Sequence, residues 1–291
     1  MTLLILAAGS GSRYGGSKQF DGIGPKGEYL LEYNLYDAIA AGFKDIIVVC
    51  KEGQEVELTD YFHERLPEEI SFSSVGQSIE DIPEGCRFPG DRQKRWGTAH
   101  AVWSSRNHIN GKFVTVNADD YYGRSSFQTT ISAQLPADYF GMIGFQLKQT
   151  LSKSGTVSRG VCEVAADELV RVEEFTAISH EGDSYSDKPT GTIFTGNELV
   201  SMNMWMLDDS IFPMIENQFR KFLSDKSQSI NAELYLPSIV QDAISQGLKN
   251  VKTFESQEKW MGLTFKGDRS EVSADLSEFT KKGVYPSPLW K

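Results

Sequence analysis

The sequence has few cysteines and no motif that pairs them. Its three cysteines are far apart, and none lies in a Cys-x-x-Cys spacing: Cys50, Cys86 and Cys162. We therefore expect neither a disulfide framework nor a thiolate metal site, and the four histidines lack metal-ligand spacing as well. No apolar run approaches the ~18 residues of a membrane span, and the apolar start is too short for a signal peptide. These absences predict a cytoplasmic protein with reduced thiols and no membrane partner.

Basic residues are also scarce. The chain has 29 Lys and Arg against 40 Asp and Glu, which gives a net charge of −11. A protein that binds duplex nucleic acid needs a basic surface, so nucleic acid is excluded as an expected partner. A small anionic substrate remains compatible, because a local basic pocket can lie on an acidic surface. The Gly-x-Ser-x-Gly motif of serine hydrolases and the Gly-Lys-Ser/Thr end of a Walker A loop are absent too.

In residues 1–137, strand and helix patterns alternate. Apolar runs predict strands over 3–7, 45–50, 70–73 and 112–116, and helical spacing predicts helices over 30–41, 56–64 and 99–105. Gly42 should end the first helix, and Ser125 with Gln128 has the form of a capping box that opens another. A long loop is expected over 76–96. This alternation is typical of an α/β fold with three α/β/α layers and a mostly parallel, Rossmann-like sheet.

After residue 138 the predicted strands lie closer together. They cover 139–146, 158–164, 169–175, 199–206, 251–254 and 260–265, and the polar segment 179–191 is expected to be an exposed loop. Helices are expected over 210–223 and 232–246, and a last one ends near 282. No repeat or linker interrupts the chain. We therefore expect a single domain over 1–291, with halves 1–137 and 138–268 and a C-terminal helix and tail over 269–291.

A Gly-rich loop follows the first predicted strand. Residues 7–19 read Ala-Ala-Gly-Ser-Gly-Ser-Arg-Tyr-Gly-Gly-Ser-Lys-Gln. Glycines let main-chain N–H groups approach a phosphate closely, and Arg13 and Lys18 add positive charge. A dinucleotide-binding loop is an alternative, because Glu52 after the second strand suits a ribose contact, although Tyr14 replaces the third glycine of that motif. A simple surface turn is the remaining alternative.

The loop resembles the signature of the nucleotidyltransferases that make nucleotide sugars, and of the related cytidylyltransferases. Leu-Ala-Ala-Gly-x-Gly-x-Arg is followed by Lys-Gln, and 24–33 is similar to the family's segment before its first helix. The resemblance covers roughly residues 1–268 and implies the nucleotide-diphospho-sugar transferase type of fold. It makes 1–137 the nucleotide-binding half and 138–268 the acceptor-binding half. It implies that Arg13 and Lys18 are catalytic, with Lys26 as the alternative signature lysine, and that Ala8, Gly9 and Gly11 bind the nucleotide.

Two further segments resemble the family's base-binding elements. Residues 96–101, Trp-Gly-Thr-Ala-His-Ala, resemble the Gly-Thr element that holds the base, which implies roles for Gly97 and Thr98. Thr98 could also cap the following helix. Gln77 matches the family's base-reading glutamine. The basic residues of 87–95 form either a solvated face or a mobile lid over the triphosphate.

Carboxylates follow a buried strand at 112–116. Asp119 matches the family's metal-binding aspartate, and Mg²⁺ binds through one or two carboxylates together with substrate phosphates. The family often carries a second aspartate in Trp-x-Asp, but here Gly262 stands at that position. Asp268 is therefore the candidate for the second metal ligand, and a helix N-cap is its alternative role.

The acceptor-binding elements match the family less completely. Residues 155–160 resemble the family's Tyr-Gly-x-Val stretch, which contacts the acceptor phosphate and sugar, and Arg159 or, as the alternative, Lys153 is expected to supply the positive charge there. Glu174 resembles the glutamate that binds sugar hydroxyls, and Asn203 the asparagine that touches the acceptor. The sequence thus predicts Mg²⁺-dependent transfer of a nucleotidyl group, from UTP or CTP, to a phosphorylated acceptor such as a sugar 1-phosphate. An NAD(P)-dependent oxidoreductase and a catalytically silent nucleotide-binding regulator are the alternatives, and the oligomeric state stays open.

Overall fold

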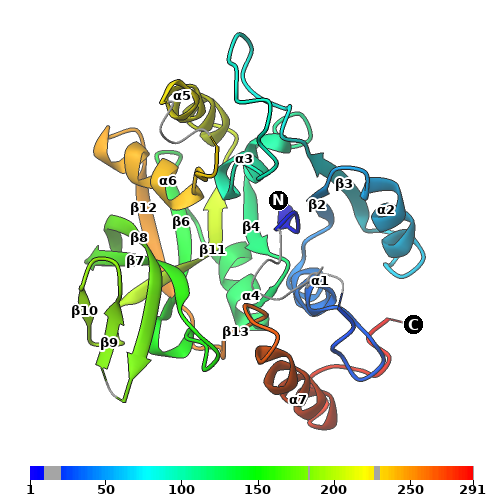
Figure 1. Ribbon diagram of the computed structural model, residues 1–291. Coiled ribbons are helices and arrows are strands. Elements are labelled where there is room, and N and C mark those ends of the chain that lie inside the picture. Colours follow the sequence, from blue (N-terminus) through cyan, green and yellow to red (C-terminus); the bar gives the residue numbers. More distant parts are fainter. Residues whose placement is uncertain (10–20, 183, 226–229, 291) are drawn as a thin grey trace.

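A computed structural model describes residues 1–9, 21–182, 184–225 and 230–290 (Figure 1). An eleven-stranded sheet in the order β10-β9-β8-β12-β6-β11-β4-β1-β2-β3 runs through them, with β7 paired to β11 and β8. Its strands are β1 Thr2–Leu6, β2 Asp45–Lys51, β3 Ser71–Gln77, β4 Phe113–Asn117, β6 Tyr139–Gln146, β7 Val157–Ala165, β8 Glu168–Glu181, β9 Ser184–Asp187, β10 Ile193–Phe194, β11 Leu199–Leu207 and β12 Asn250–Glu255. A separate pair joins β5 Asp120–Tyr121 to β13 Met261–Gly262. The helices are α1 Leu30–Ala41, α2 Glu55–His63, α3 Thr98–Ser104, α4 Arg124–Ser132, α5 Ile211–Ser224, α6 Leu236–Ser245 and α7 Asp268–Lys281, with a 3₁₀ turn at Leu147–Gln149.

The predicted α/β fold is confirmed, and its parallel part lies in the first half of the chain. β1 pairs in parallel with β2 and with β4, and β2 pairs in parallel with β3. The apolar runs of β1, β2 and β4 are buried on both faces, as central parallel strands require, whereas β3 at the edge of the sheet is only partly buried. The carboxyl ends of these four strands therefore meet at one edge of the sheet.

The second half of the chain makes the sheet mixed rather than mostly parallel. β11 lies antiparallel between β4 and β6, and β7, β8, β9 and β10 form antiparallel pairs, while β12 runs parallel to β6. The connections between the successive strands β7, β8, β9 and β10 are too short for a crossover helix, so these strands must reverse direction. The prediction of an exposed loop over 179–191 is partly wrong, because β8 and β9 form an antiparallel hairpin there. The strands of a hairpin with one solvated face need no continuous apolar run, so the sequence pattern does not reveal them.

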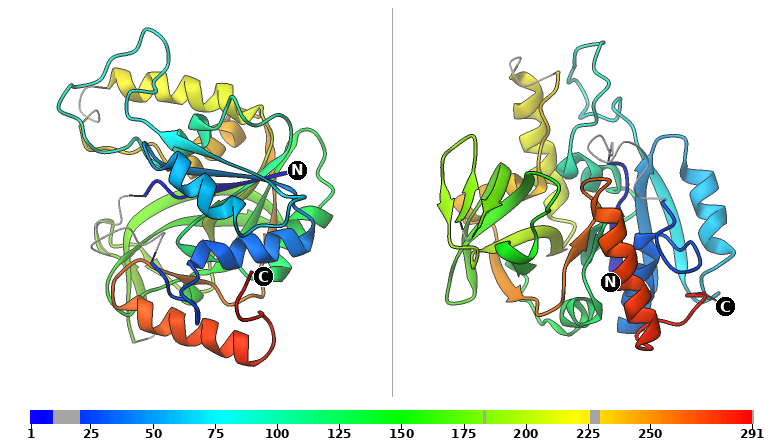
Figure 2. Two further views of the ribbon diagram at one scale, coloured as in Figure 1. Left: turned by 90° about the vertical axis from the view of Figure 1, so that its right-hand side faces the viewer. Right: turned by 60° about the horizontal axis from the view of Figure 1, so that its bottom comes forward.

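Helices cover both faces of the sheet (Figure 2). Leu3 and Ile5 of β1 pack in one hydrophobic core with residues of α1, α2 and α4. Leu4 and Leu6 point to the opposite face and pack in a second core with residues of α3, α5 and α6. Burial of each such leucine contributes about 1.5–3 kcal/mol. Alternate side chains of one strand therefore hold the two helical layers.

The C-terminal helix and tail pack against the first half of the chain. α7 and the last residues share a third apolar core with α1, β5 and β13. In Figure 1, α7 lies below α1. The Tyr285 hydroxyl donates to Asp37 of α1, whose other carboxylate oxygen accepts from Arg124 Nε at 3.0 Å. Tyr121 of β5 hydrogen-bonds Tyr285 at 2.7 Å. The tail thus ties together elements that are far apart in the sequence. Within the described ranges, no helix is both long and apolar enough to cross a bilayer.

The predicted helix ends are confirmed in one case and wrong in another. Gly42 ends α1 in the left-handed conformation, with φ of 112°. α4 begins at Arg124, after Gly123, and Ser125 is inside the helix and forms no capping box. The carboxylate of Glu258 instead accepts from the Ser125 N–H at 2.9 Å. An acid from a distant loop serves the helix N-terminus, and local sequence gives no sign of it.

Candidate active site

The Gly-rich loop begins at the carboxyl edge of the parallel strands. The Ala7 N–H donates to the Val49 carbonyl at 2.7 Å, and the Ala118 N–H donates to the Leu6 carbonyl at 3.0 Å. The chain that leaves β1 therefore starts between β2 and β4, with Ala8 buried and Gly9 exposed. The predicted residues Gly11, Arg13 and Lys18 lie outside the described residues. Their roles stay predictions.

Gln77 ends β3 and contacts the turn before α3. Its Nε2 donates to the Gly97 carbonyl at 3.1 Å and to His100 Nδ1 at 2.9 Å. His100 Nε2 donates to the Asp81 carbonyl at 2.7 Å, so both ring nitrogens have partners in the neutral imidazole. Burial lowers the pKa of His100 to about 4. The structure thus brings together Gln77 and Gly97, two of the predicted base-binding residues. The amide nitrogen of Gln77 is used in these contacts, so its oxygen, Oε1, is the atom that can accept a hydrogen bond from a base.

Gly97 is required by a close approach of main chains. Its φ is 100°, and a Cβ there would lie 2.6 Å from the Leu234 carbonyl oxygen. The neighbouring Thr98 does not cap α3, of which it is the first residue, so that expectation is wrong. Its hydroxyl accepts instead from the Leu236 N–H at 2.9 Å, at the start of α6. The Gly-Thr element therefore also joins α3 to α6.

The basic segment 87–95 matches neither expected role in full. Arg92 is buried, its guanidinium lies 3.5 Å from the centre of the Trp96 ring, and it donates to the carbonyls of Arg95 and Ala232. It is a structural residue. Burial, and after it the charge of Arg95, lowers the pKa of Lys51 at the end of β2, so these two cations lie near each other at the same edge.

Two consecutive carboxylates follow β4. Asp119 is partly exposed, and its carbonyl accepts from the Leu263 N–H at 2.9 Å. Asp120 is buried and pairs with Gly262 in the small sheet. A Cβ at Gly262 would lie 2.8 Å from Asp120 Oδ1 and 2.4 Å from the Trp260 ring. The Asp120 carboxylate and the Trp260 ring thus leave no room for the aspartate that the family has at this position.

Asp268 forms structural hydrogen bonds with both of its oxygens. Oδ2 accepts from the N–H groups of Thr264 and Phe265 at 3.0 and 2.7 Å, and Oδ1 accepts from Ser152 Oγ at 2.7 Å. Asp268 is the first residue of α7, whose N-cap is Gly267, so the expected capping role is wrong. The carboxylate instead closes the turn that precedes the helix.

On the acceptor side, Arg159 and Glu174 lie in paired strands. Arg159 is buried, and Nε, Nη1 and Nη2 each donate to Thr150 or Ser158. Three of its five N–H groups therefore bond to the fold, and the phosphate contact stays a prediction. Burial raises the pKa of Glu174 to about 7; the Arg159 charge opposes this shift and the Glu233 charge adds to it.

Contacts link Asn203 to Glu174 on one side and to the end of β4 on the other. A Cβ at Gly160 would touch both Glu174 Oε2, at 3.4 Å, and Ser201 Cβ, at 3.5 Å, and Ser201 Oγ accepts from the Asn203 N–H. The amide of Asn203 in turn contacts Asn117 at the end of β4. Asn117 lies two residues before Asp119 in the chain. Sequence reasoning missed Asn117, although its position at the end of a buried strand was a signal.

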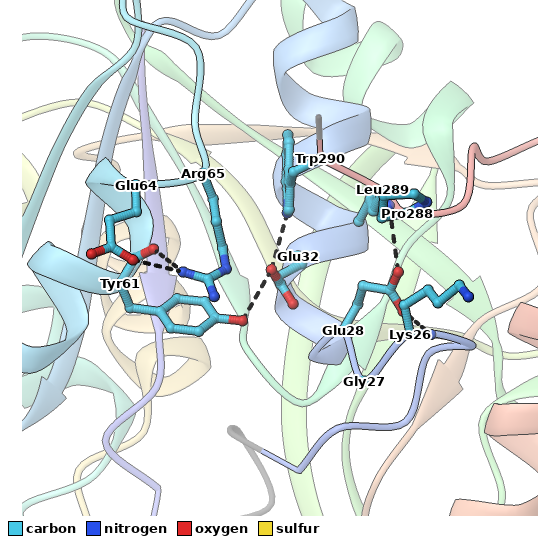
Figure 3. A pocket seen from close by; sticks show the side chains of 10 residues that line it. All are labelled: Lys26, Gly27, Glu28, Glu32, Tyr61, Glu64, Arg65, Pro288, Leu289 and Trp290. Carbon is cyan, nitrogen blue, oxygen red and sulfur yellow. Dashed lines mark hydrogen bonds and ion pairs between the residues drawn. The ribbon is translucent and has the colours of Figure 1, made fainter.

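One pocket lies apart from these residues. Lys26 lines a pocket of about 320 Å³ with Glu28, Glu32, Tyr61 and the segment 288–290 (Figure 3). Trp290 Nε1 donates to Glu32 there at 3.0 Å. None of the other candidate residues lines that pocket. Elsewhere, within the part of the chain that the structure describes, no three His, Cys, Asp or Glu side chains cluster as a multidentate metal site would require.

Comparison with known proteins tests the predicted family resemblance. Residues 3–90 match the family model of the MobA-like NTP transferase domain. A UTP–glucose-1-phosphate uridylyltransferase of Staphylococcus saprophyticus is 24% identical over 207 residues, which cover 65% of this chain and 64% of the relative, so the match spans slightly less than two thirds of its length. These matches confirm the predicted resemblance, and both the family and the relative are nucleotidyltransferases.

Solved structures show the same fold. The inositol-1-phosphate CTP transferase of T. maritima aligns with a TM-score of 0.65 at 15% identity, over 96% of both chains. A UDP-glucose pyrophosphorylase complexed with UDP-glucose aligns with a TM-score of 0.64 at 17% identity, over 95% of this chain and 98% of that one. At these identities the likeness establishes the α/β fold, and substrates have to be argued from the site.

Proposed function

We propose that this protein transfers a nucleotidyl group from UTP or CTP to a phosphorylated acceptor of the sugar 1-phosphate type, on a Rossmann-like, three-layer scaffold. One observation carries the proposal: the start of the Gly-rich loop, Asp119 and the Gln77–Gly97 pair share the carboxyl edge of β1 to β4. Ligands of open α/β sheets bind beyond that edge. The match of residues 3–90 to an NTP transferase domain supports the same assignment.

The reaction in this proposal is an in-line displacement. An oxygen of the acceptor phosphate attacks the α-phosphorus, and the bond to pyrophosphate breaks. Arg13 and Lys18 hold the β- and γ-phosphates, so catalysis consists of positioning and charge neutralisation. Gln77 Oε1 accepts a hydrogen bond from N3–H of uracil or from the amino group of cytosine.

Magnesium fits the donor set that the described residues offer. Mg²⁺ takes hard oxygen ligands, needs only one or two protein carboxylates and completes its shell with phosphates and water. Asp119 supplies such a carboxylate beside the Gly-rich loop. Asp268 is a weaker candidate, because its oxygens accept three hydrogen bonds from the protein. When bound, the ion would neutralise charge that develops between the α-phosphate and pyrophosphate.

The test is pyrophosphate release from each of five nucleoside triphosphates with glucose 1-phosphate or inositol 1-phosphate, with and without Mg²⁺. We expect turnover with UTP or CTP that requires the metal. Tight nucleotide binding without turnover would instead favour a silent regulator, and binding of NADH alone would favour the oxidoreductase. Preference for a purine nucleotide would overturn the assignment of the base.

A further inference from the structure

Asn203 has an unusual backbone in the middle of β11. Its φ is 59°, in the left-handed region that asparagine tolerates better than most residues, and the pairing of β11 with β6 slips between Ser201 and Trp205. The Asn203 carbonyl accepts from Thr115 Oγ1 at 2.7 Å, and its N–H donates to Ser201 Oγ at 3.2 Å. The bulge is thus fixed from both sides. Such local strain is often found at functional sites.

Three polar side chains extend from Asp120 to this bulge. Asn117 Nδ2 donates to Asp120 Oδ2 at 2.7 Å, and Asn203 Nδ2 donates to Asn117 Oδ1 at 3.3 Å. Asp120 Oδ2 is the acceptor in the first of these hydrogen bonds, so the nitrogen of the Asn117 amide faces Asp120. Asn117 then presents its oxygen to Asn203, which donates to it through its nitrogen. The Asp120 carboxylate therefore sets the orientation of both amides.

The last atom of this series is Asn203 Oδ1, which is buried and accepts no hydrogen bond from the described residues. A buried acceptor without a donor is costly to the fold, and such atoms are rare in proteins. Contacts link Asn203 to Glu174, through Ser201 and Gly160, and to Asn117 of β4. The proposed reaction needs to hold its acceptor near these residues. A donor group of the substrate would satisfy the oxygen.

We propose that Asp120 and Asn117 are positioning residues that orient Asn203 so that its oxygen accepts a hydrogen bond from a hydroxyl group of the acceptor. This inference rests on the proposed function and narrows its substrate class. The acceptor is then polyhydroxylated, as sugar and cyclitol phosphates are. A carbonyl, ether or phosphate oxygen at this point would face Asn203 Oδ1 as a second acceptor and would be rejected.

Tyr122 holds Asn117 in a fixed position relative to the bulge at Asn203. Its hydroxyl accepts from the Asn117 N–H at 2.9 Å and donates to the Met202 carbonyl at 2.6 Å. The main chain before Asn203 and the main chain of Asn117 are therefore held by one hydroxyl. Sliding one strand therefore cannot rearrange the hydrogen bonds of the two amides. Only a flip of both amides would exchange the nitrogen and the oxygen of Asn203.

The experiment compares hydroxyl and fluorine on the acceptor. Glucose 1-phosphate is tested beside its 2-, 3-, 4- and 6-deoxyfluoro analogues, because fluorine keeps the size of the hydroxyl but cannot donate. We expect wild-type protein to disfavour fluorine at one position by roughly tenfold or more in kcat/KM. The fluorine ratio is kcat/KM for glucose 1-phosphate divided by kcat/KM for the fluoro analogue. In Asp120→Asn both amides can flip, so the fluorine ratio should fall several-fold toward one. The KM for UTP should stay within about twofold of the wild-type value, because the nucleotide does not contact Asn203 in the proposal.

A second variant and a control separate positioning from stability. Asn203→Gly tolerates the positive φ and removes the amide, so it should fold and lose the same discrimination. Asn34→Ala is the matched control, because Asn34 Nδ2 donates to the Asp120 main-chain carbonyl at 2.6 Å and is not part of the series. It should lower the melting temperature and leave the fluorine ratio unchanged.

Calorimetric binding of the same phosphates gives the comparison without turnover. Binding that discriminates against fluorine, with no pyrophosphate release, would defeat the proposed reaction and keep the inference about Asn203. An equal fluorine ratio in wild type, Asp120→Asn and Asn203→Gly would overturn the inference and leave the reaction standing. If none of these phosphates binds, the proposed acceptor class is wrong, and the inference with it.

Discussion

The side-chain amide of Gln77 donates to the main-chain carbonyl of Gly97 over 3.1 Å. This contact joins the carboxyl end of β3 to the turn that opens α3, across a connection of 20 residues. The same nitrogen also donates to His100 Nδ1, so its two protons hold the turn and a buried ring together. Gln77 therefore shapes the base site through its nitrogen and has only its oxygen to offer a nucleotide.

Gln77→Glu should weaken both the fold and nucleotide binding. The carboxylate cannot donate to Gly97, and His100 would have to take up a proton to bond it. We expect a loss of about 1–3 kcal/mol in the free energy of unfolding and a clear rise in the Kd for UTP. Urea titration and calorimetry measure the two effects. Gln128→Glu, at an exposed position on α4, is the control and should change neither. An unchanged Kd for UTP in Gln77→Glu would remove Gln77 from the base site.

Gly97→Ala should destabilise the protein far more than Gly85→Ala. Both glycines have a positive φ, of 100° and 80°. A Cβ at Gly97 would overlap the Leu234 carbonyl oxygen, whereas nothing lies within 4 Å of a Cβ at Gly85. The backbone term alone costs about 1–2 kcal/mol, and we expect the overlap at Gly97 to add at least as much. Equal unfolding free energies for the two variants would contradict the close approach of α3 and the segment before α6.

His100 should make the fold less stable in acid. Its folded-state pKa, about 4, lies below the ordinary value of 6.5, so the unfolded chain takes up the proton first. Stability from this group is full above pH 6.5 and falls as the pH drops toward 4, by at most roughly 3 kcal/mol. His100→Gln should flatten this part of the pH profile of unfolding, and His108→Gln, on the surface, should not. A profile as steep as that of wild type would contradict the burial of a neutral imidazole.

Glu174 should act in the opposite direction over nearly the same range. Its pKa is raised to about 7, so the folded chain takes up the proton first. Its stabilising contribution is full below about pH 4.5 and is lost as the pH rises through 7. Glu174→Gln should therefore raise stability relative to wild type at pH 8, by about 1 kcal/mol because the side chain keeps partial contact with water, with little change at pH 5. Glu173→Gln, its exposed neighbour, should show no such dependence on pH.

Asp119→Asn and Asp268→Asn should separate a metal ligand from a structural acid. Asparagine at 119 loses the charge that offsets Mg²⁺, so activity should fall by orders of magnitude with little change in melting temperature. Asparagine at 268 loses one of the oxygens that accept from the turn and from Ser152, so the melting temperature should fall by several degrees. Mn²⁺ binding, followed by electron paramagnetic resonance, should be lost only in the first variant. Wild-type Mn²⁺ affinity in Asp119→Asn would overturn its assignment.

The local sequence was sufficient to predict the helices and strands whose hydrophobic pattern reflects their own burial. The β-branched run of β2 and the glycine at the end of α1 each satisfy constraints within a few residues, so their positions were predictable. The start of the Gly-rich loop could be placed for a similar reason, because it follows β1 directly, whereas the Gly-Thr element was identified from its resemblance to the family. The hairpin of β8 and β9 was not predictable, since its polar strands are stabilised by a partner rather than by an apolar face.

The sequence by itself determined an α/β fold, a Gly-rich segment after β1 and a carboxylate after β4. Only the tertiary structure decided what the polar side chains do, because a hydrogen bond depends on which distant atoms meet. It assigned Thr98 to the start of α6, Arg159 to the main chain of Thr150, and Asp268 to the turn before α7. It also joined Asp120, Asn117 and Asn203. The two asparagines are 86 positions apart in the chain. No local pattern encodes such a contact, since sheet pairing alone brings β4 and β11 together.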